Sequence, residues 1–399
     1  MRLVLTLLAL SLFVTGQAWS QTAEAFLEKA RPFTIASLAP VKPDPSNRFV
    51  KDPSAIALGR NLFFDAGLSL SGTVSCATCH VTGGSFRPNE SIPAGRDRKF
   101  RTVMPIQGAA YQDFLFWDGR ADSLWMQALG PLENPSEHGL SRSSVASYVS
   151  KNYADDLKKI LKQTDLPEIQ YDASPSGTMA QRNAWSVLSE KQRDDINQIF
   201  VAVGKSIAAY EAQIPIEPNS WDKLVSSVAD NSDNYAEIPL DVLAGFSLFT
   251  GKAGCSTCHT GPLFSDLDFH NTGLATPPNA SLDIGRQAVS LDLFNSPFNC
   301  LGAFSDASPK DCGKLRFFEF SLERLFGTFR TPTLRGVSKR QRLGHSGSVG
   351  SLTEMVRHYN LAPDGPHGAV FGKVSFSELK PLHLSEEEVD AIVAFLEAL

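Results

Sequence analysis

The pentapeptide Cys76-Ala77-Thr78-Cys79-His80 returns almost unchanged as Cys255-Ser256-Thr257-Cys258-His259. The pattern C-x-x-C-H is typical of covalent c-type haem attachment. Its two thiols form thioethers with the haem vinyl groups, and the adjacent histidine binds the iron. A redox dithiol or half of a zinc site needs no histidine directly after the second cysteine, and here that histidine occurs in both copies. The sequence therefore predicts two covalently bound c-type haems, with His80 and His259 as iron ligands.

The residues that precede the two motifs also match. Residues 59–63 read GRNLF and residues 245–249 read GFSLF, so both have the spacing Gly-x-x-Leu-Phe. Each stretch is expected to form a short helix that leads into a haem loop. The repetition predicts an all-α fold with two related cytochrome c-like haem domains and long loops.

Two longer helices are predicted from apolar spacing. One covers residues 186–213, and Pro215 and Pro218 end it, which places the domain boundary between residues 21–215 and residues 216–399. The other runs to the C-terminus and begins with a capping box formed by Ser385 and Glu388.

The composition limits the class of protein. The chain has 399 residues, of which 42% are hydrophobic and 20% charged, which is ordinary for a globular protein. The formal net charge is −6, so there is no excess of basic residues to bind a phosphate backbone. Nucleic-acid binding is therefore excluded as the main activity.

The N-terminus has the pattern of an export signal. Arg2 is followed by an apolar run over residues 3–14 and then by Ala18-Trp19-Ser20, a small-x-small cleavage site. The run is too short to span roughly 30 Å of hydrocarbon. We therefore expect residues 1–20 to be a cleaved signal peptide, the mature protein to have no membrane span, and its compartment to be the periplasm.

Cys300 and Cys312 are the two cysteines outside the haem motifs. In an exported chain they are expected to form a disulfide that closes the polar loop between them. A functional thiol pair is the alternative.

Further motifs carry a family resemblance. They are FWDGRA at 116–121, QALGPL at 127–132, NPSE at 134–137, FRTPTLR at 329–335, HSG at 345–347 and HYN at 358–360. With the two haem motifs, they resemble the bacterial dihaem cytochrome c peroxidase family and, within it, the MauG branch. The resemblance covers nearly all of residues 50–399 and implies that the first haem reacts with hydrogen peroxide, while the second stores or relays oxidising equivalents.

The resemblance also implies roles for single residues around the first haem. Trp117 matches the tryptophan between the haems, Glu137 the distal acid, Gln127 the distal amide and Pro131 a residue that shapes the distal pocket. Cleavage of the peroxide O–O bond needs a group that moves a proton from one oxygen to the other, and a carboxylate can do this. His138, next to Glu137, is a second polar candidate.

One expected feature of the family is missing. Many members have a histidine between the first haem motif and the tryptophan, which caps the first iron, but this chain has no histidine between His80 and His138. The first haem is therefore expected to have an open sixth position. Arg96, Arg98 and Arg101 occupy that stretch and are expected to bind haem propionates.

The distal ligand of the second haem is also taken from the resemblance. The MauG branch has a tyrosine fourteen residues after the His-x-Gly element, and here that residue is Tyr359. Met355 and His358, on the helix expected from about Leu352, are the alternatives. A tyrosinate would stabilise the higher oxidation states of iron, whereas a methionine would raise the reduction potential.

Some members also hold a calcium ion between the haems, partly through backbone carbonyls. The corresponding positions in this chain are Thr102, Arg340 and Arg342. The asparagine usual in the family is replaced by Thr102, but carbonyl ligands do not depend on the side chain, so the resemblance still implies a calcium site here.

Three functions compete. The first is oxidation of a partner-protein residue, expected to be a tryptophan, through a high-valent dihaem state. Ala253 stands where MauG has an exit tryptophan, which favours a role like that of the related MbnH proteins, with Trp185 and Trp221 as alternative exits. The second function is a scavenging peroxidase fed by a small cytochrome c or a cupredoxin. The third is an electron carrier with two capped haems. The oligomeric state is not predicted.

Overall fold

The computed structural model describes residues 22–81, 87–88, 101–275, 282–318, 321–363 and 377–399. The described part of the chain is predominantly helical, as the sequence predicts, and its strands are limited to two short pairs, β1 (His80–Val81) with β2 (Arg87–Pro88) and β3 (Phe269–His270) with β4 (Phe329–Arg330). The first half contains α2 (Pro53–Phe64), α3 (Cys76–Cys79), α4 (Leu124–Glu133), α5 (Arg142–Asn152), α6 (Ala154–Leu161), α7 (Met179–Val187) and α8 (Glu190–Glu211). The second half contains α9 (Ser220–Asp230), α10 (Leu240–Thr250), α11 (Ser290–Asn295), α12 (Gly313–Arg316), α13 (Leu322–Leu325), α14 (Leu352–Leu361) and α15 (Glu386–Glu397). Within the described residues, no helix is long and apolar enough to cross a membrane.

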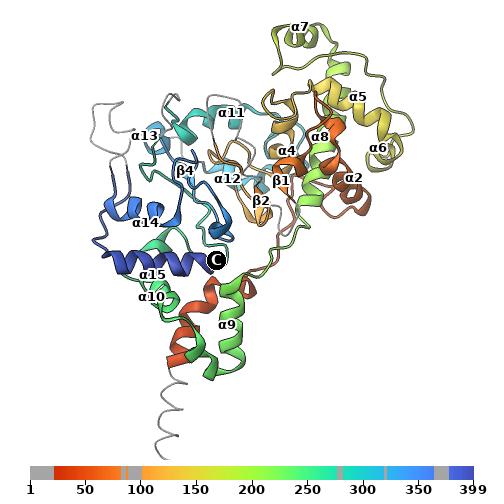
Figure 1. The fold of residues 1–399 in the computed structure, drawn as a ribbon. Coiled ribbons are helices and arrows are strands. Elements are labelled where there is room, and N and C mark those ends of the chain that lie inside the picture. Colours follow the sequence, from red (N-terminus) through yellow and green to blue (C-terminus); the bar gives the residue numbers. More distant parts are fainter. Residues whose placement is uncertain (1–21, 82–86, 89–100, 276–281, 319–320, 364–376) are drawn as a thin grey trace, which may run out of the picture.

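Two hydrophobic cores organise these helices (Figure 1). The first core lies among α2, α4, α5, α6 and α8, and the second among α9, α10, α14 and α15. The boundary predicted at residue 215 falls between α8 and α9, but two segments cross it. Phe26 and Phe33, near the N-terminus, pack in the second core, and Phe298 packs in the first. The sequence could not show this exchange because each segment contributes only a few apolar side chains, which would fit either core.

The Gly-x-x-Leu-Phe stretches mark the same helix crossing in both domains. A Cβ atom on Gly59 of α2 would lie 1.8 Å from the carbonyl oxygen of Ser206 in α8. A Cβ atom on Gly245 of α10 would lie 2.0 Å from the carbonyl oxygen of Ala391 in α15. Glycine is therefore needed at each crossing to let the two backbones approach.

The two long helices confirm one prediction and correct another. Ser385 and Glu388 form the predicted capping box at the start of α15. The helix predicted over residues 186–213 is instead two helices, because α7 ends at Val187 and Ser189 caps α8 through a capping box with Gln192. Charged residues follow Ser189, so the spacing of apolar residues shows no break at the point where α8 begins.

A local repeat underlies the two domains. We call residues 102–133 the first repeat and residues 330–361 the second repeat. Near its start, each repeat has a glycine in the left-handed backbone conformation, Gly108 or Gly336. A short 3-10 helix follows it, η4 (Ala109–Tyr111) or η9 (Val337–Lys339). A turn closed by an isolated bridge follows, Leu115 to Ala121 or Leu343 to Val349. A serine then caps a helix of ten residues, α4 or α14.

The two repeats meet face to face and exchange equivalent hydrogen bonds. The Thr102 N–H donates to the His345 carbonyl at 2.9 Å, and the Arg330 N–H donates to the Trp117 carbonyl at 2.8 Å. Trp117 and His345 occupy equivalent positions in their turns, and their rings pack edge to face with centroids 6.4 Å apart. The exchange places Trp117 at the junction of the two domains.

The structure contains the disulfide between Cys300 and Cys312 that the sequence predicts. The Cys300 N–H donates to Asp122, which ties this loop to the first domain at 2.7 Å.

Candidate active site

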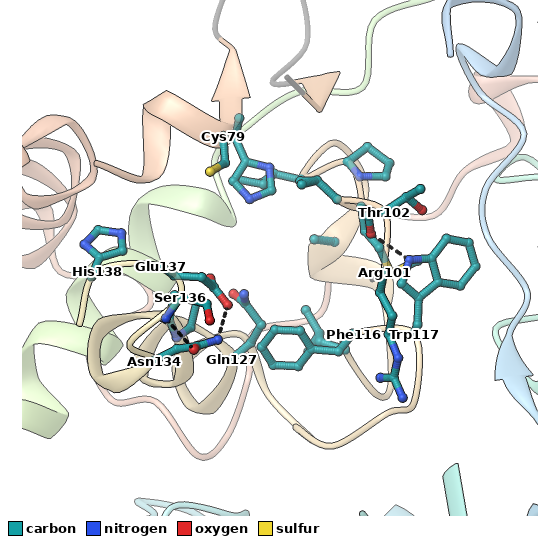
Figure 2. A pocket seen from close by; sticks show the side chains of 18 of the residues that line it. Cys79, Arg101, Thr102, Phe116, Trp117, Gln127, Asn134, Ser136, Glu137 and His138 are labelled. Carbon is teal, nitrogen blue, oxygen red and sulfur yellow. Dashed lines mark hydrogen bonds between the residues drawn. The ribbon is translucent and has the colours of Figure 1, made fainter. Parts of the chain in front are cut away.

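A cavity of about 980 Å³ in the first domain brings together most of the residues predicted for the first haem. Its lining includes Cys79, His80, Trp117, Gln127, Pro131 and Glu137. Figure 2 shows Cys79 on one side of the cavity, Gln127 and Glu137 on the opposite side and Trp117 at one end. The cavity therefore has an attachment wall and a polar wall that face each other.

The attachment wall is formed by α3 and the residue that follows it. Ser75 and Thr78 form a capping box that starts this single helical turn at Cys76. Cys76 and Cys79 are free thiols, and burial raises the pKa of each of them. Burial lowers the pKa of His80 to about 4, so its imidazole is neutral and able to bind a metal. The Cys79 thiol and the neutral His80 imidazole line the cavity, and Cys76 lies at the other end of the same helical turn, a set of residues that fits a covalently bound haem.

The polar wall depends on the end of α4. Pro131 lies within this helix and has no N–H, so the regular bond to the carbonyl of Gln127 is missing. After the helix the chain folds back, and the His138 N–H donates to the Pro131 carbonyl at 3.2 Å. This turn returns Glu137 to the cavity beside Gln127.

Asn134 holds Glu137 in place. Its side-chain amide donates to Glu137 Oε1 at 2.6 Å, while its Oδ1 accepts from the Ser136 N–H at 3.0 Å (Figure 2). One asparagine thus fixes both the turn and the carboxylate. Asn134 belongs to the NPSE motif, but the Asn-x-x-Glu spacing alone does not show which group the amide contacts.

His138 lines the same cavity and is anchored through one of its two ring nitrogens. Its Nδ1 lies 2.7 Å from the Leu68 carbonyl, and burial lowers the pKa of the ring. The ring is therefore neutral and anchored to the segment between α2 and the first haem motif.

Glu211, at the end of α8, is a cavity residue that the sequence analysis missed. It is only 6% exposed, and its Oε2 has no hydrogen-bond partner among the described residues. Burial raises the pKa of its carboxyl to about 8. The available signal was a single acid near the end of a largely apolar stretch, residues 199–212, in which Lys205 is the other charged residue. Glu211 is a second acid in the cavity, and it is protonated at neutral pH.

Trp117 lies where the cavity meets the second domain. Its side chain is buried, and its indole N–H donates to the Thr102 carbonyl at 2.8 Å. Together with the edge-to-face contact with His345, this fixes the ring between the two repeats.

Arg101 differs from its predicted role as a propionate ligand. Its guanidinium forms a salt bridge with Asp118 and two hydrogen bonds with Asp283, at 2.7 and 2.8 Å. Two buried carboxylates therefore neutralise its charge and join the domains. Arg96 and Arg98, the other two predicted propionate ligands, lie outside the described residues.

The residues of the second haem motif have their own set of contacts. Nδ1 of His259 lies 3.0 Å from the Phe264 carbonyl, which leaves Nε2 for a metal. Cys255 and Cys258 are free thiols. Burial is the main cause that raises the pKa of Tyr359, and Cys255 and Cys258 contribute to the same shift. These residues also fit a covalently bound haem.

The two alternative ligands have other surroundings. Nε2 of His358 lies 2.7 Å from the Thr272 carbonyl, and Met355 packs against the second core. Tyr359 and Pro131 occupy equivalent positions in the two repeats, as do Met355 and Gln127. Tyr359 as the distal ligand stays a prediction.

A cluster beside the second motif is not a resident metal site. Cys258, Asp266 and His270 lie close enough to bind one ion, but Cys258 is expected to form a thioether. His270 instead lies between two carboxylates, 2.8 Å from Asp266 and 2.7 Å from Glu378. The bond to Asp266 is the main cause that raises the pKa of His270 to about 12, so the cluster is an ionic bridge.

The residues predicted to surround a calcium ion are partly engaged elsewhere. The Thr102 carbonyl accepts from Trp117, and Arg342 Nη1 donates to the Gly347 carbonyl at 3.5 Å. Arg340 follows η9, and its N–H donates to Val337. The calcium site stays a prediction.

The predicted exit residues lie in different environments. Trp221 is completely buried in the second core, and Ala253 is also buried. Trp185 is partly exposed, with the Arg142 guanidinium 5.3 Å from its ring centroid. Of the two tryptophans, Trp185 is therefore the accessible one.

Comparison with known proteins agrees with this geometry. Residues 53–230 match the family model of di-haem cytochrome c peroxidases. The methylamine utilization protein MauG of Methylorubrum extorquens is 30% identical over 349 residues, which cover 87% of this chain and 78% of that protein. A cytochrome-c peroxidase, IdrP1, of Denitromonas iodatirespirans is 27% identical over 98% of this chain and 92% of its own length.

Two solved structures share the fold. The diheme peroxidase BthA of Burkholderia thailandensis superposes with a TM-score of 0.61 at 22% identity, covering 90% of this chain and 89% of BthA. A MauG-like protein associated with microbial copper homeostasis superposes with a TM-score of 0.60 at 21% identity, covering 91% of this chain and 93% of that one.

Proposed function

Because this chain belongs to the di-haem cytochrome c peroxidase family, we propose that it is a periplasmic peroxidase of the MauG type that oxidises a residue of a partner protein. The observation that carries the proposal is the first cavity, in which Gln127 and Glu137 face Cys79 and His80. When bound there, haem supplies the iron that binds peroxide and accepts its oxidising equivalents.

Glu137 is the proton carrier in this proposal. Its carboxylate is held by Asn134 at 2.6 Å and is directed into the cavity, where it can take a proton from one peroxide oxygen and return it to the other. Gln127 can donate an amide hydrogen bond that orients the peroxide. Such proton transfer contributes about 10²–10⁴ in rate.

An open first iron is supported by what surrounds it. The sequence between His80 and His138 contains no histidine that could cap the first iron, and the cavity wall opposite His80 presents Gln127 and Glu137. A peroxide molecule then needs no prior change of ligand to reach the first site.

The second site is proposed to store an oxidising equivalent. We assign covalent c-type attachment to both motifs, and His259 and Tyr359 as the ligands of the second iron, because Nδ1 of His259 lies 3.0 Å from the Phe264 carbonyl and Tyr359 occupies in α14 the position that Pro131 has in α4. Trp117, at the junction between the repeats, lies on the short route from one site to the other. A calcium ion near Thr102 is a secondary element of the proposal.

The partner is proposed to be a periplasmic protein with an oxidisable tryptophan. The export signal supports the location, and the likeness to MauG and to a MauG-like protein associated with copper homeostasis supports the type of reaction. Ala253 stands in place of the MauG exit tryptophan, so we expect this chain not to mature a quinone cofactor.

A second candidate function is peroxide scavenging with a small cytochrome c or a cupredoxin as electron donor. The relatives named cytochrome-c peroxidase favour it. A direct test adds peroxide to the holoprotein together with either a reduced small cytochrome c or an extract of periplasmic proteins. We expect slow cytochrome oxidation and peroxide-dependent oxidation of tryptophan in one extract protein, mapped by mass spectrometry. Fast turnover of the cytochrome without protein oxidation would favour the scavenger instead.

A further inference from the structure

Two tyrosines share one carboxylate in the first domain. The hydroxyl groups of Tyr148, in α5, and Tyr153, between α5 and α6, donate to Oδ2 of Asp65 at 2.9 and 2.8 Å. The Gly67 N–H donates to Oδ1 at 2.8 Å, which fixes the carboxylate. All three side chains are partly buried, so the group is shielded from bulk water without being sealed from the surface.

This arrangement suits one-electron oxidation. A phenol that loses an electron must also release its proton, and a carboxylate already bonded to the hydroxyl can accept that proton without any movement of heavy atoms. Burial and the charge of Asp65 raise the pKa of both phenols, so both carry their protons before oxidation.

The pair is linked to the first cavity along two routes. On one side, Gly67 is followed by Leu68, whose carbonyl holds the cavity residue His138 at 2.7 Å. On the other side, Asp65 directly follows Phe63 and Phe64, whose rings lie 5.5 and 6.3 Å from the ring of Tyr210.

The residue after Tyr210 is Glu211, which lines the cavity. Asp65 is therefore connected to the first site through a backbone segment and through a packed aromatic group. An electron could leave the pair along either route.

Three of the described tryptophans, Trp125, Trp185 and Trp221, are less suited to hold an oxidising equivalent. A cation lies over two of them, since Lys205 Nζ is 4.9 Å from the ring centroid of Trp125 and Arg142 is 5.3 Å from that of Trp185. A positive charge opposes the removal of an electron from the ring. The indole N–H of Trp221 has no hydrogen-bond partner in the part of the chain that the structure describes, so no base is ready to take its proton.

We propose that Tyr148 and Tyr153 form a redox-active pair that donates electrons to the first haem after peroxide has oxidised it. One electron passes from a phenol to the oxidised haem, the O–H bond of that phenol breaks, and its proton forms a new O–H bond on Asp65. The products are a neutral tyrosyl radical and a protonated Asp65, and the second tyrosine still donates a hydrogen bond to the same carboxyl group. This inference rests on the peroxidase reaction proposed above and adds a radical site within the same chain.

The test uses the dihaem protein and one molar equivalent of hydrogen peroxide, without added reductant. Samples are frozen rapidly and examined by electron paramagnetic resonance, with ring-deuterated tyrosine incorporated to assign the radical. We expect a tyrosyl signal in the wild type that is lost in the double variant Tyr148→Phe, Tyr153→Phe. Asp65→Asn keeps a hydrogen-bonding side chain but removes the base, so the signal is expected to form about tenfold more slowly or not at all. Tyr171→Phe, at an exposed tyrosine outside the pair, is the matched control and should keep the signal.

The outcomes are distinct. If the ferric wild type does not react with peroxide, the proposed peroxidase function itself fails. If peroxide reacts but the tyrosyl signal is absent, or survives in the double variant, only the redox-active pair is wrong. Optical spectra of the resting variants check that both haems remain bound, so a folding defect cannot imitate the expected loss. Peptide mapping after repeated peroxide additions gives a second readout, with oxidation products expected on Tyr148 or Tyr153 in the wild type.

Discussion

At equivalent positions of the two repeats, the first domain has Gln127 and Pro131 where the second has Met355 and Tyr359. The helix crossings give a similar contrast, because Glu211 of α8 corresponds to the buried Leu396 of α15 when Gly59 and Gly245 are aligned. The first domain thus has two polar side chains and a proline at these positions. The second domain has larger apolar side chains and a tyrosine that can bind iron. One local framework can therefore serve an open site and a capped site, depending on a few side chains.

The largest expected effect is the loss of the proton carrier. Glu137→Gln keeps the size of the side chain and a partner for Asn134 but removes the base, so the peroxide reaction of the first haem should slow about 10²–10⁴-fold. Stopped-flow mixing of the ferric protein with peroxide measures it. Glu217→Gln, at an exposed glutamate outside the cavity, should leave the rate unchanged. Equal rates in wild type and Glu137→Gln would mean that Glu137 is not the proton carrier that distinguishes the first domain.

The second prediction concerns the distal ligand of the second haem, which the open first site lacks. Tyr359→Met replaces a phenolate with a thioether, which favours the ferrous state, so the midpoint potential of the second haem should rise by about 0.1 V or more. Spectroelectrochemical titration of both haems is the measurement, and the potential of the first haem should hardly move. Met355→Leu is the control. A large shift in Met355→Leu with none in Tyr359→Met would assign the ligand to Met355.

The glycine crossings test whether the two domains rest on the same packing. Gly59→Ala or Gly245→Ala places a methyl group against a helix backbone, and each should destabilise its own domain by about 3 kcal/mol. Gly313→Ala is the control, because no described atom lies within 4 Å of the added Cβ there. Thermal unfolding followed at the two haem bands would show which domain is affected. Destabilisation of only one of the two variants would show that the helix crossings are not equivalent.

The last prediction concerns the dependence of stability on pH. The carboxyl of Glu211 has a pKa of about 8 in the folded protein and an ordinary, lower value when unfolded, so the folded state binds the extra proton between these values. Stability should therefore fall as pH rises from about 4.5 to 8 and then level off, at up to 1.4 kcal/mol per unit. Glu211→Gln should lose this dependence, as measured by denaturant unfolding at several pH values. An unchanged pH profile in the variant would refute the assignment of the raised pKa.

The sequence predicted much of this molecule because its strongest signals are local. The capping box at Ser385 and the glycines before the two Cys-x-x-Cys-His motifs depend on residues close in the chain. The family motifs also grouped Gln127, Pro131 and Glu137 correctly around one cavity.

What the sequence did not predict depends on distant contacts. The two carboxylates that neutralise Arg101 come from separate parts of the chain, and Asp283 lies in the second half. Glu211 reads as the polar end of a helix until α8 is placed against the cavity. The repeat of residues 102–133 and 330–361 is also weak in sequence, because turn geometry rather than side-chain identity is retained.

The central claim is that the first haem site is open and the second is capped but able to store an equivalent. The most direct test is a stoichiometric peroxide titration of the diferric protein without reductant, followed by optical, electron paramagnetic resonance and Mössbauer spectroscopy. We predict that, in samples frozen directly after mixing, both ferric signals disappear together and both irons are oxidised beyond the ferric state, before Tyr148 or Tyr153 donates an electron. No reaction until the second haem has been reduced would contradict it and would assign the chain to the peroxidases that require reductive activation.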